Sequence, residues 1–255
     1  MSDTALVLRQ VRAEQRSFWR NPASAFFAFV FPLMFLGIFG TQNRGARLDG
    51  LGAIPYNDYY VPALISFGVI GATFTNISVS LTIRRDSGVL KRLRGTPLPP
   101  WAFMMGVIGS SAVVSAILAA LLTAAGMIFY DVPAPRHPGA LLLVLVVGGG
   151  SFCALGLALS GIIPNAEAAP AVTNAVVLPL LFISGTFYPL DPTSVLTHIA
   201  NWFPMRHFAL AIFHSFDPTG TTPGLQWSDQ WKVLLWGVAG LYVAVRRFRW
   251  EPRKG

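Results

Sequence analysis

Long stretches without charge alternate with short charged segments along this chain. Five stretches contain no Asp, Glu, Lys, Arg or His, and they run from Asn21 to Asn43, Tyr59 to Ile83, Gly95 to Tyr130, Pro138 to Ala166 and Ala168 to Leu190. Each is long enough to cross a bilayer as a helix, which takes ~20 apolar residues. A sixth stretch, Ser228 to Val245, is more polar, but a basic tail follows it directly. We therefore predict six transmembrane helices, at residues 22–41, 59–83, 101–130, 139–163, 166–187 and 228–247.

The N-terminal segment before the first of these spans has a helical pattern of its own. Over residues 3–20, four arginines (Arg9, Arg12, Arg16 and Arg20) form one stripe at 3.6 residues per turn, and apolar side chains lie opposite. A disordered basic leader would not keep this period. The pattern predicts an interfacial helix that lies flat at the inner leaflet.

Composition supports a single all-α polytopic membrane domain over residues 1–255. The chain is 53% hydrophobic and 12% charged, whereas a soluble domain carries about 25% charge. Fourteen of the 19 Lys and Arg residues lie on one side if both termini and the loop after the second span are cytoplasmic. The net charge of +8 therefore reports membrane orientation, and nucleic acid is not an expected partner.

The loop at residues 84–100 is the densest run of charge in the chain and reads as a short amphipathic helix. Asp86 or Ser87 is expected to cap its start, and Gly95 and Pro97 to end it. Its apolar residues, Val89, Leu90 and Leu93, fall on one side, and its basic residues, Lys91, Arg92 and Arg94, on the other. A basic loop held at the anionic cytoplasmic leaflet is the alternative. The apolar triplet favours a helix that docks on a soluble partner.

Polar and aromatic side chains in the second and fifth spans mark a candidate substrate path. An intramembrane asparagine is costly against lipid, so Asn76 should face another helix or a water-filled path. Phe67 and Phe74 accompany it, and the fifth span offers Thr173 and Asn174. For Asn76, structural packing and substrate contact remain equal alternatives, whereas the polar groups of the fifth span suggest a path beside the second span.

The outer segment at residues 190–215 is apolar but interrupted by prolines. Asp191 is expected to cap a helix that has Pro192 at its first position, and Pro204 splits the segment into two helices of about a dozen residues. Such halves are too short to cross, so we predict helices that dip into the outer leaflet. Two further full spans are the competing interpretation.

No catalytic or metal-binding constellation stands out in the sequence. Cys153 is the single cysteine, and the four histidines fall on the predicted outer side at spacings that match no metal motif. We assign no metal site and no catalytic residue, so the chain is not expected to be an enzyme.

Three segments, in this order, resemble the membrane subunits of ABC-2 type exporters: Arg20-Asn21-Pro22, RRDSGVLKRLRGTP, and SGTFYPLDPTSVLTHIANWFPMRHFALAI. The resemblance implies an N-terminal connecting helix, a cytoplasmic coupling helix between spans two and three, and re-entrant outer helices before span six. It places ATPase coupling on Asp86, Gly88, Val89, Leu90, Lys91, Leu93, Arg94, Gly95, Thr96 and Pro97. It places the re-entrant segment on Pro189, Asp191, Pro192 and Pro204, and the substrate path on Phe67, Phe74, Asn76, Thr173 and Asn174.

The expected function is that of the permease subunit of such an exporter, in the cell membrane. The chain has no G-x-x-x-x-G-K-[ST] phosphate loop, so ATP and Mg²⁺ should bind a separate P-loop ATPase, present in two copies, and this chain should bind no cofactor. The resemblance implies a second permease chain, identical or related. Short outer loops favour a drug-like or lipid-like substrate, with lipid-linked polysaccharide as the alternative.

Two functions of other classes rank lower. An ion-driven secondary transporter usually keeps a carboxylate at mid-membrane, whereas the acidic residues here lie at predicted membrane edges or in loops. A membrane enzyme or scaffold is less favoured still, because no paired carboxylates or nucleophile motif lies at one depth.

Overall fold

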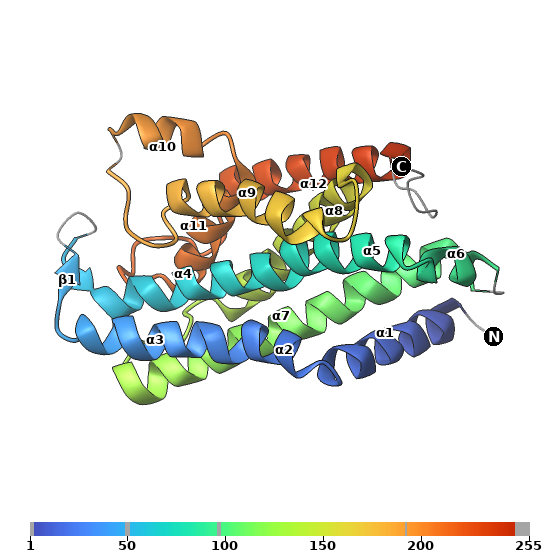
Figure 1. Ribbon diagram of the computed structural model, residues 1–255. Helices are drawn as coiled ribbons and strands as arrows, with labels where there is room; N and C mark the ends of the chain where they lie inside the picture. The colour runs from blue at the N-terminus through green and yellow to red at the C-terminus, as the bar shows by residue number, and fades with distance from the viewer. Residues whose placement is uncertain (1–2, 49–51, 96–97, 192, 248–255) are drawn as a thin grey trace.

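The protein is an elongated bundle of helices in the computed structural model, which describes residues 3–48, 52–95, 98–191 and 193–247 (Figure 1). In chain order the elements are α1 (Asp3–Trp19), α2 (Pro22–Ala25), η1 (Phe26–Val30), α3 (Phe31–Gln42), β1 (Arg47–Leu48), β2 (Ile54–Pro55), α4 (Tyr56–Ile70), η3 (Gly71–Thr75), α5 (Asn76–Asp86), α6 (Val89–Arg94), α7 (Pro100–Tyr130), α8 (Pro138–Ile162), α9 (Ala168–Ile183), α10 (Val195–Ala200), α11 (Pro204–Phe216) and α12 (Trp227–Arg247). The two short strands pair antiparallel in the loop between α3 and α4.

Four helices of the described chain are long and apolar enough to cross a membrane, and they coincide with the first four predicted spans. They are Pro22–Gln42, which joins α2, η1 and α3; Tyr56–Asp86, which joins α4, η3 and α5; Pro100–Tyr130; and Pro138–Ile162. We call the first two the first and second long helices. The fifth predicted span falls on α9, whose 16 residues extend about 24 Å, less than the ~30 Å hydrocarbon thickness. The sixth falls on the more polar α12, so crossing by α9 and α12 stays a prediction.

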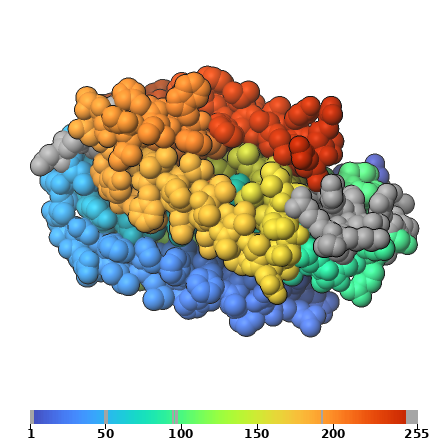
Figure 2. Space-filling view, turned by 45° about the horizontal axis from the view of Figure 1, so that its top comes forward, coloured from blue at the N-terminus to red at the C-terminus, as the bar shows by residue number. Residues whose placement is uncertain are grey.

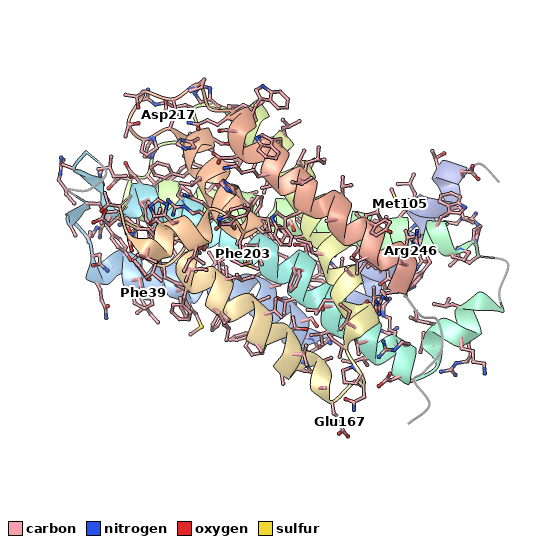
Figure 3. All side chains as sticks on the ribbon, turned by 90° about the horizontal axis from the view of Figure 1, so that it is seen from above. Phe39, Met105, Glu167, Phe203, Asp217 and Arg246 are labelled. Atoms are coloured by element: carbon pink, nitrogen blue, oxygen red, sulfur yellow. The ribbon has the colours of Figure 1, made fainter. Side chains whose placement is uncertain are left out.

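The three basic segments of the sequence gather at one end of the bundle. Figure 1 shows the start of α1, the short α6 and the end of α12 together there, whereas β1 and α10 lie at the opposite end. The side chains follow the same division, with Arg246 and Glu167 at one end and Asp217 and Phe39 at the other (Figure 3). This is the charge asymmetry that the positive-inside rule associates with a cytoplasmic face.

Helix α8 forms the centre of the bundle because its small residues let neighbouring backbones approach. A Cβ added at Gly156 would lie 2.7 Å from the carbonyl oxygen of Phe74 in η3, and one at Gly240 of α12 would lie 2.9 Å from the amide nitrogen of Leu155. On another side of α8, Phe152 is fully buried, with its ring 5.2 Å from that of Phe208 in α11. Gly156 and Gly240 are therefore points where a side chain would prevent the helices from packing this closely.

Helix α1 lies alongside the first turns of α7 (Figure 1). The Gln15 side chain donates to the carbonyl and the hydroxyl oxygens of Ser110, at 2.8 and 3.0 Å. With 31 residues, α7 extends about 46 Å, well beyond the hydrocarbon thickness, so it offers α1 a lateral support. The predicted helix is present, and it is packed on the bundle rather than free.

The segment at residues 190–215 forms two short helices that separate at Pro204, which occupies the first turn of α11, as expected. The second has 13 residues, close to the predicted length, but α10 has only 6. The expected cap was wrong. Helix α10 begins at Val195, with Ser194 as its N-cap, because the Ser194 hydroxyl accepts from the amide of Leu196 at 3.2 Å. The Asp191 carboxylate instead accepts from the amide of Thr193 at 2.8 Å, which closes a turn before the helix. Pro192 lies outside the described residues, and whether the segment enters the membrane stays a prediction.

Candidate functional site

A groove of about 860 Å³ opens between the first long helix, the second long helix and α9. Phe27 and Phe31 line it from the first helix, Phe67 and Asn76 from the second, and Leu178 from α9. Figure 2 shows α9 (gold) lying along the N-terminal helices (blue) on this side of the molecule. The volume falls within the ~300–1,000 Å³ of small-molecule pockets, and the lining is mostly apolar.

Three of the five predicted path residues meet at this groove, and two do not. Phe67, Asn76 and Asn174 line it, although the last comes from a different helix. Phe74 is 5% exposed and packs in the hydrophobic core. Thr173 is fully buried, and its hydroxyl lies 3.4 Å from the Ser78 hydroxyl, to which it donates. In this structure Phe74 and Thr173 therefore pack between the helices that form the groove and do not line it, and a role for them in the substrate path stays a prediction.

Both long helices have a π-helical turn beside the groove. Residues Phe26–Val30 form one, and Gly71–Thr75 form the other. Phe27 and Ala28 of the first, and Gly71 and Ala72 of the second, line the groove. A π-helical turn inserts an extra residue and is frequent at functional sites. Sequence reasoning missed both turns.

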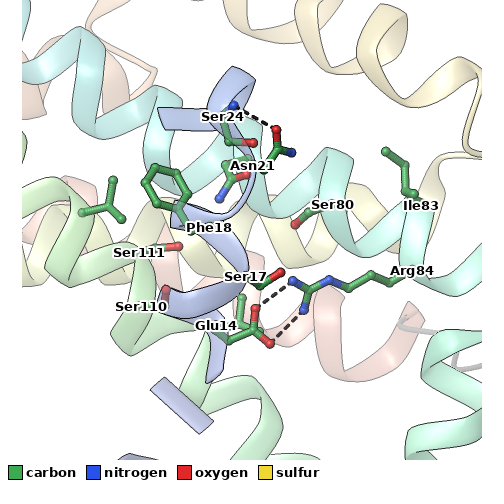
Figure 4. A pocket seen from close by; sticks show the side chains of 13 residues that line it. Glu14, Ser17, Phe18, Asn21, Ser24, Ser80, Ile83, Arg84, Ser110 and Ser111 are labelled. Atoms are coloured by element: carbon green, nitrogen blue, oxygen red, sulfur yellow. Dashed lines mark hydrogen bonds and ion pairs between the residues drawn. The ribbon is translucent and has the colours of Figure 1, made fainter. Parts of the chain in front are cut away.

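A smaller cavity of about 250 Å³ adjoins the groove at Phe18, Ser24 and Asn76, which line both spaces. Its walls come from α1, the start of the first long helix, the second long helix and α7, and its lining is rich in hydroxyl groups (Figure 4). The Arg84 guanidinium binds the Glu14 carboxylate there in a two-point ion pair, at 2.9 and 2.7 Å. Glu14 and Ser110 were not identified from the sequence, and Ser80 was noted only as one of several polar residues of the second span. The neighbouring serines of the third span were the available signal for Ser110.

The loop at residues 84–100 contains a short helix, as predicted, but the helix is shorter than expected and differently capped. Helix α6 begins after Gly88, whose φ of +71° favours glycine, so neither Asp86 nor Ser87 is its cap. Leu90 is fully buried in a cluster with Ile77 and Phe103 of this chain, and Leu93 packs against the same cluster.

The apolar side of α6 therefore faces its own bundle, not a partner's groove. Its described exposed residues are Lys91, Arg92 and Gly95, and Val89 is half-buried. Thr96, Pro97 and the side chain of Arg94 lie outside the described part of the structure.

Arg85 and Asp86 tie the end of the second long helix to the turn between α8 and α9, and we call them the Arg85–Asp86 clasp. The Arg85 side chain, 2% exposed, donates to the carbonyl oxygens of Ser160 at 2.8 Å, Ile163 at 2.9 Å and Pro164 at 3.2 Å. The Asp86 carboxylate accepts from the amide of Ala166 and pairs with Arg85 at 3.3 Å. A cation at the carbonyl end of α8 also complements the helix dipole.

Comparison with known proteins decides the family. The model of the ABC-2 type transporter family matches residues 5–216. The chain belongs to this family. It is 23% identical over 183 residues to the "Probable multidrug ABC transporter permease YbhR" of Escherichia coli strain K12, a match that covers 71% of this chain and 50% of that relative. It is 26% identical over 148 residues to the "Inner membrane transport permease YadH" of the same strain, which covers 57% of each. The chain thus spans about half the length of the curated relatives it matches.

The ABC-2 match extends from α1 through α11 and so includes the groove, the polar cavity and the clasp, whereas α12 lies beyond it. Membership identifies the chain as a membrane transport component. The roles of single residues come from their geometry in this structure.

At the end of the bundle opposite the basic segments, a buried histidine joins the helices of this ABC-2 chain, whereas the sequence had given the histidines no role. His207 of α11 is 3% exposed; its Nδ1 lies 2.7 Å from the Asp229 carboxylate of α12, and its Nε2 lies 2.8 Å from the Asn201 carbonyl oxygen. Both partners are acceptors, so the ring joins α11, α12 and the turn after α10. The signal available in the sequence was Asp229 at the start of an otherwise apolar stretch.

Proposed function

We propose that the chain is the permease subunit of an ABC exporter and moves a drug-like or lipid-like substrate through the groove. The observation that carries this proposal is the groove itself, where Phe67, Asn76 and Asn174 converge from two helices in a chain of the ABC-2 type family. Aromatic walls with a few amide groups suit apolar ligands that also need hydrogen bonds. The name of the relative YbhR includes "multidrug", which agrees with such a substrate.

ATP hydrolysis by a separate P-loop ATPase would reach the groove through the loop that carries α6. The exposed Lys91 and Arg92 offer a basic surface to the ATPase. Immediately before α6, the Arg85–Asp86 clasp holds the α8–α9 turn, and Arg84 binds Glu14 of α1. A displacement of this loop would therefore move α9 and α1, and both carry residues that line the groove.

The assembly we propose contains two ATPase subunits and two permease chains, identical or related, in the cell membrane. Both termini and α6 face the cytoplasm in this arrangement, which the grouping of basic segments at one end supports (Figure 1). An impermeant thiol reagent tests the orientation in a Cys153→Ala background. Thr219→Cys should react in intact cells and Ser87→Cys should not, since both positions are exposed but lie at opposite ends. The reverse labelling would overturn the orientation.

The function is tested by purifying the affinity-tagged chain from its native membrane. We expect a P-loop ATPase to co-purify in a one-to-one ratio with the permease, and candidate substrates to stimulate its ATP hydrolysis after reconstitution in liposomes. Asn76→Leu should change which compounds stimulate hydrolysis without reducing co-purification, because the leucine removes polarity from the groove at no insertion cost. Failure of any P-loop ATPase to co-purify would overturn the exporter proposal.

A further inference from the structure

The groove and the polar cavity adjoin each other and differ in chemistry, and we call them the larger and the smaller half of one recess. They share Phe18, Ser24 and Asn76. The larger half is lined mainly by aromatic, aliphatic and small residues, whereas most side chains around the smaller half carry a hydroxyl, amide, carboxylate or guanidinium group. A ligand that fills both halves must itself have an apolar part and a polar part.

Several polar groups of the smaller half are available to a ligand. Within the described chain, no hydrogen bond is made by the Ser17 or Ser80 hydroxyls or by the Asn76 side-chain amide, although all three line the cavity. Figure 4 shows Ser80 and Ser17 on opposite walls. Hydroxyl and amide groups both donate and accept, so they suit a head that offers both kinds of partner.

The charge in this half is balanced. Arg84 and Glu14 are its only charged lining residues in the described chain, and they bind each other at 2.7 and 2.9 Å. A head with net charge would have to break this ion pair or remain partly unpaired, which is costly at half-buried groups. An uncharged or zwitterionic head meets no such cost. The volume of about 250 Å³ equals roughly eight water molecules at ~30 Å³ each, so the head must be small.

We propose that the substrate is an amphiphile whose small uncharged or zwitterionic head occupies the polar cavity while its apolar body lies in the groove. This inference rests on the proposed export function and specifies the substrate class. The polar cavity lies toward the basic end of the bundle, where Arg84 precedes α6, and the groove extends away from it. A lipid-like molecule in the inner leaflet has this orientation already, with its head toward the cytoplasm.

The orientation is tested by photolabelling of the purified permease, together with any ATPase that co-purifies, in lipid nanodiscs. Two dodecylphosphocholine probes are used below their micellar concentration, one with a diazirine beside the head and one with it at the end of the alkyl chain. We expect the head-side probe to label α1, α5 and the α7 segment that contains Ser110. The tail-end probe should label η1, η3 and α9. Labelling in the reverse order, or of the same peptides by both probes, would overturn the proposal.

Substitutions in the polar cavity provide an independent measurement. Ser80→Leu places apolar volume in the cavity and should reduce head-side labelling at least about tenfold, because it removes a hydrogen-bond partner and space together. Ser80→Ala, which removes only the hydroxyl, should reduce it about threefold to tenfold. Ser87→Leu makes the same chemical change at an exposed position outside the cavity and should leave labelling intact. Unchanged labelling in Ser80→Ala would contradict the proposal even if Ser80→Leu failed to fold.

Different measurements would contradict the proposed export function and the proposed substrate class. Absence of a co-purifying ATPase contradicts export, whereas the labelling pattern is measured on the permease itself. A complex that hydrolyses ATP in response to apolar compounds, but whose polar cavity no head-side probe labels, would retain the exporter function and refute the amphiphile.

Discussion

Arg85→Gln tests whether the Arg85–Asp86 clasp holds the bundle together. The native guanidinium is almost fully buried and donates to three backbone carbonyl oxygens at the end of α8 and in the following turn. Glutamine is shorter, carries no charge and has a single amide group in place of the fork. Its amide can donate to only some of the three carbonyl oxygens, so at least one buried carbonyl group loses its hydrogen-bond donor.

The loss of stability is set by the buried groups that lose their partners in the variant. Each buried polar group deprived of its partner costs about 1–3 kcal/mol, and breaking a buried charged pair costs about 3–5 kcal/mol. The Asp86 carboxylate keeps the Ala166 amide but loses its cation. We expect a loss of about 3 kcal/mol, which corresponds to a melting temperature lower by roughly 6–12 °C for a chain of this size.

The assay is thermal unfolding of the purified chain in detergent, followed by tryptophan fluorescence. Arg92→Gln is the matched control because it removes the same charge from an exposed residue of α6, and it should shift the midpoint by less than about 2 °C. Equal midpoints for the two variants would show that water or detergent satisfies the carbonyl groups and would refute the clasp.

Three further predictions concern the groove, the core and α6. Asn174→Leu should change the range of compounds that stimulate ATP hydrolysis. Thr173→Val, on the buried side of the same helix, should lower the melting temperature without changing that range. If both variants changed the range, Thr173 would also belong to the substrate path. Gly156→Ala should lower the melting temperature, because its Cβ would lie 2.7 Å from a backbone oxygen. Gly150→Ala is the control: its Cβ would have no atom within 4 Å, so it should be neutral or stabilising by up to about 0.5–1 kcal/mol. Equal melting temperatures for the two variants would contradict the close packing at Gly156. Arg92→Glu should reduce co-purification of the ATPase several-fold, and the reduction should be larger at low salt. Arg92→Lys keeps the charge and should retain co-purification. If the two variants co-purified equally, α6 would not be part of the docking surface.

Hydrophobic length predicted most of the fold because it depends on each segment alone. The first four predicted spans match four long apolar helices, and the two outer helices separate at Pro204 as expected. The caps depended on details that composition does not contain. Gly88 begins α6 through a positive φ. The expected cap, Asp86, instead accepts from the amide of Ala166, 80 residues further along the chain, and local sequence does not indicate such a distant partner.

Part of the groove could be predicted from single residues within the apolar spans. Asn76 and Asn174 stood out because an amide in an apolar span needs an explanation. Thr173 offered the same signal, yet its helix turns it inward. The two π-helical turns change which residues of their helices face the groove, and no local sequence pattern predicts them. The polar cavity required α1 to pack on α7, a contact between segments about 95 residues apart.

The His207–Asp229 contact also bears on how the chain enters the membrane during synthesis. Helix α12 carries Asp229, Gln230 and Lys232 within its first two turns, so it is a poor substrate for insertion by itself. Among the described residues, the Asp229 carboxylate pairs with the buried His207 of α11, a helix that is synthesised earlier. If α12 crosses the membrane as proposed, its contact with α11 should assist its insertion, because His207 gives the Asp229 carboxylate a partner away from water.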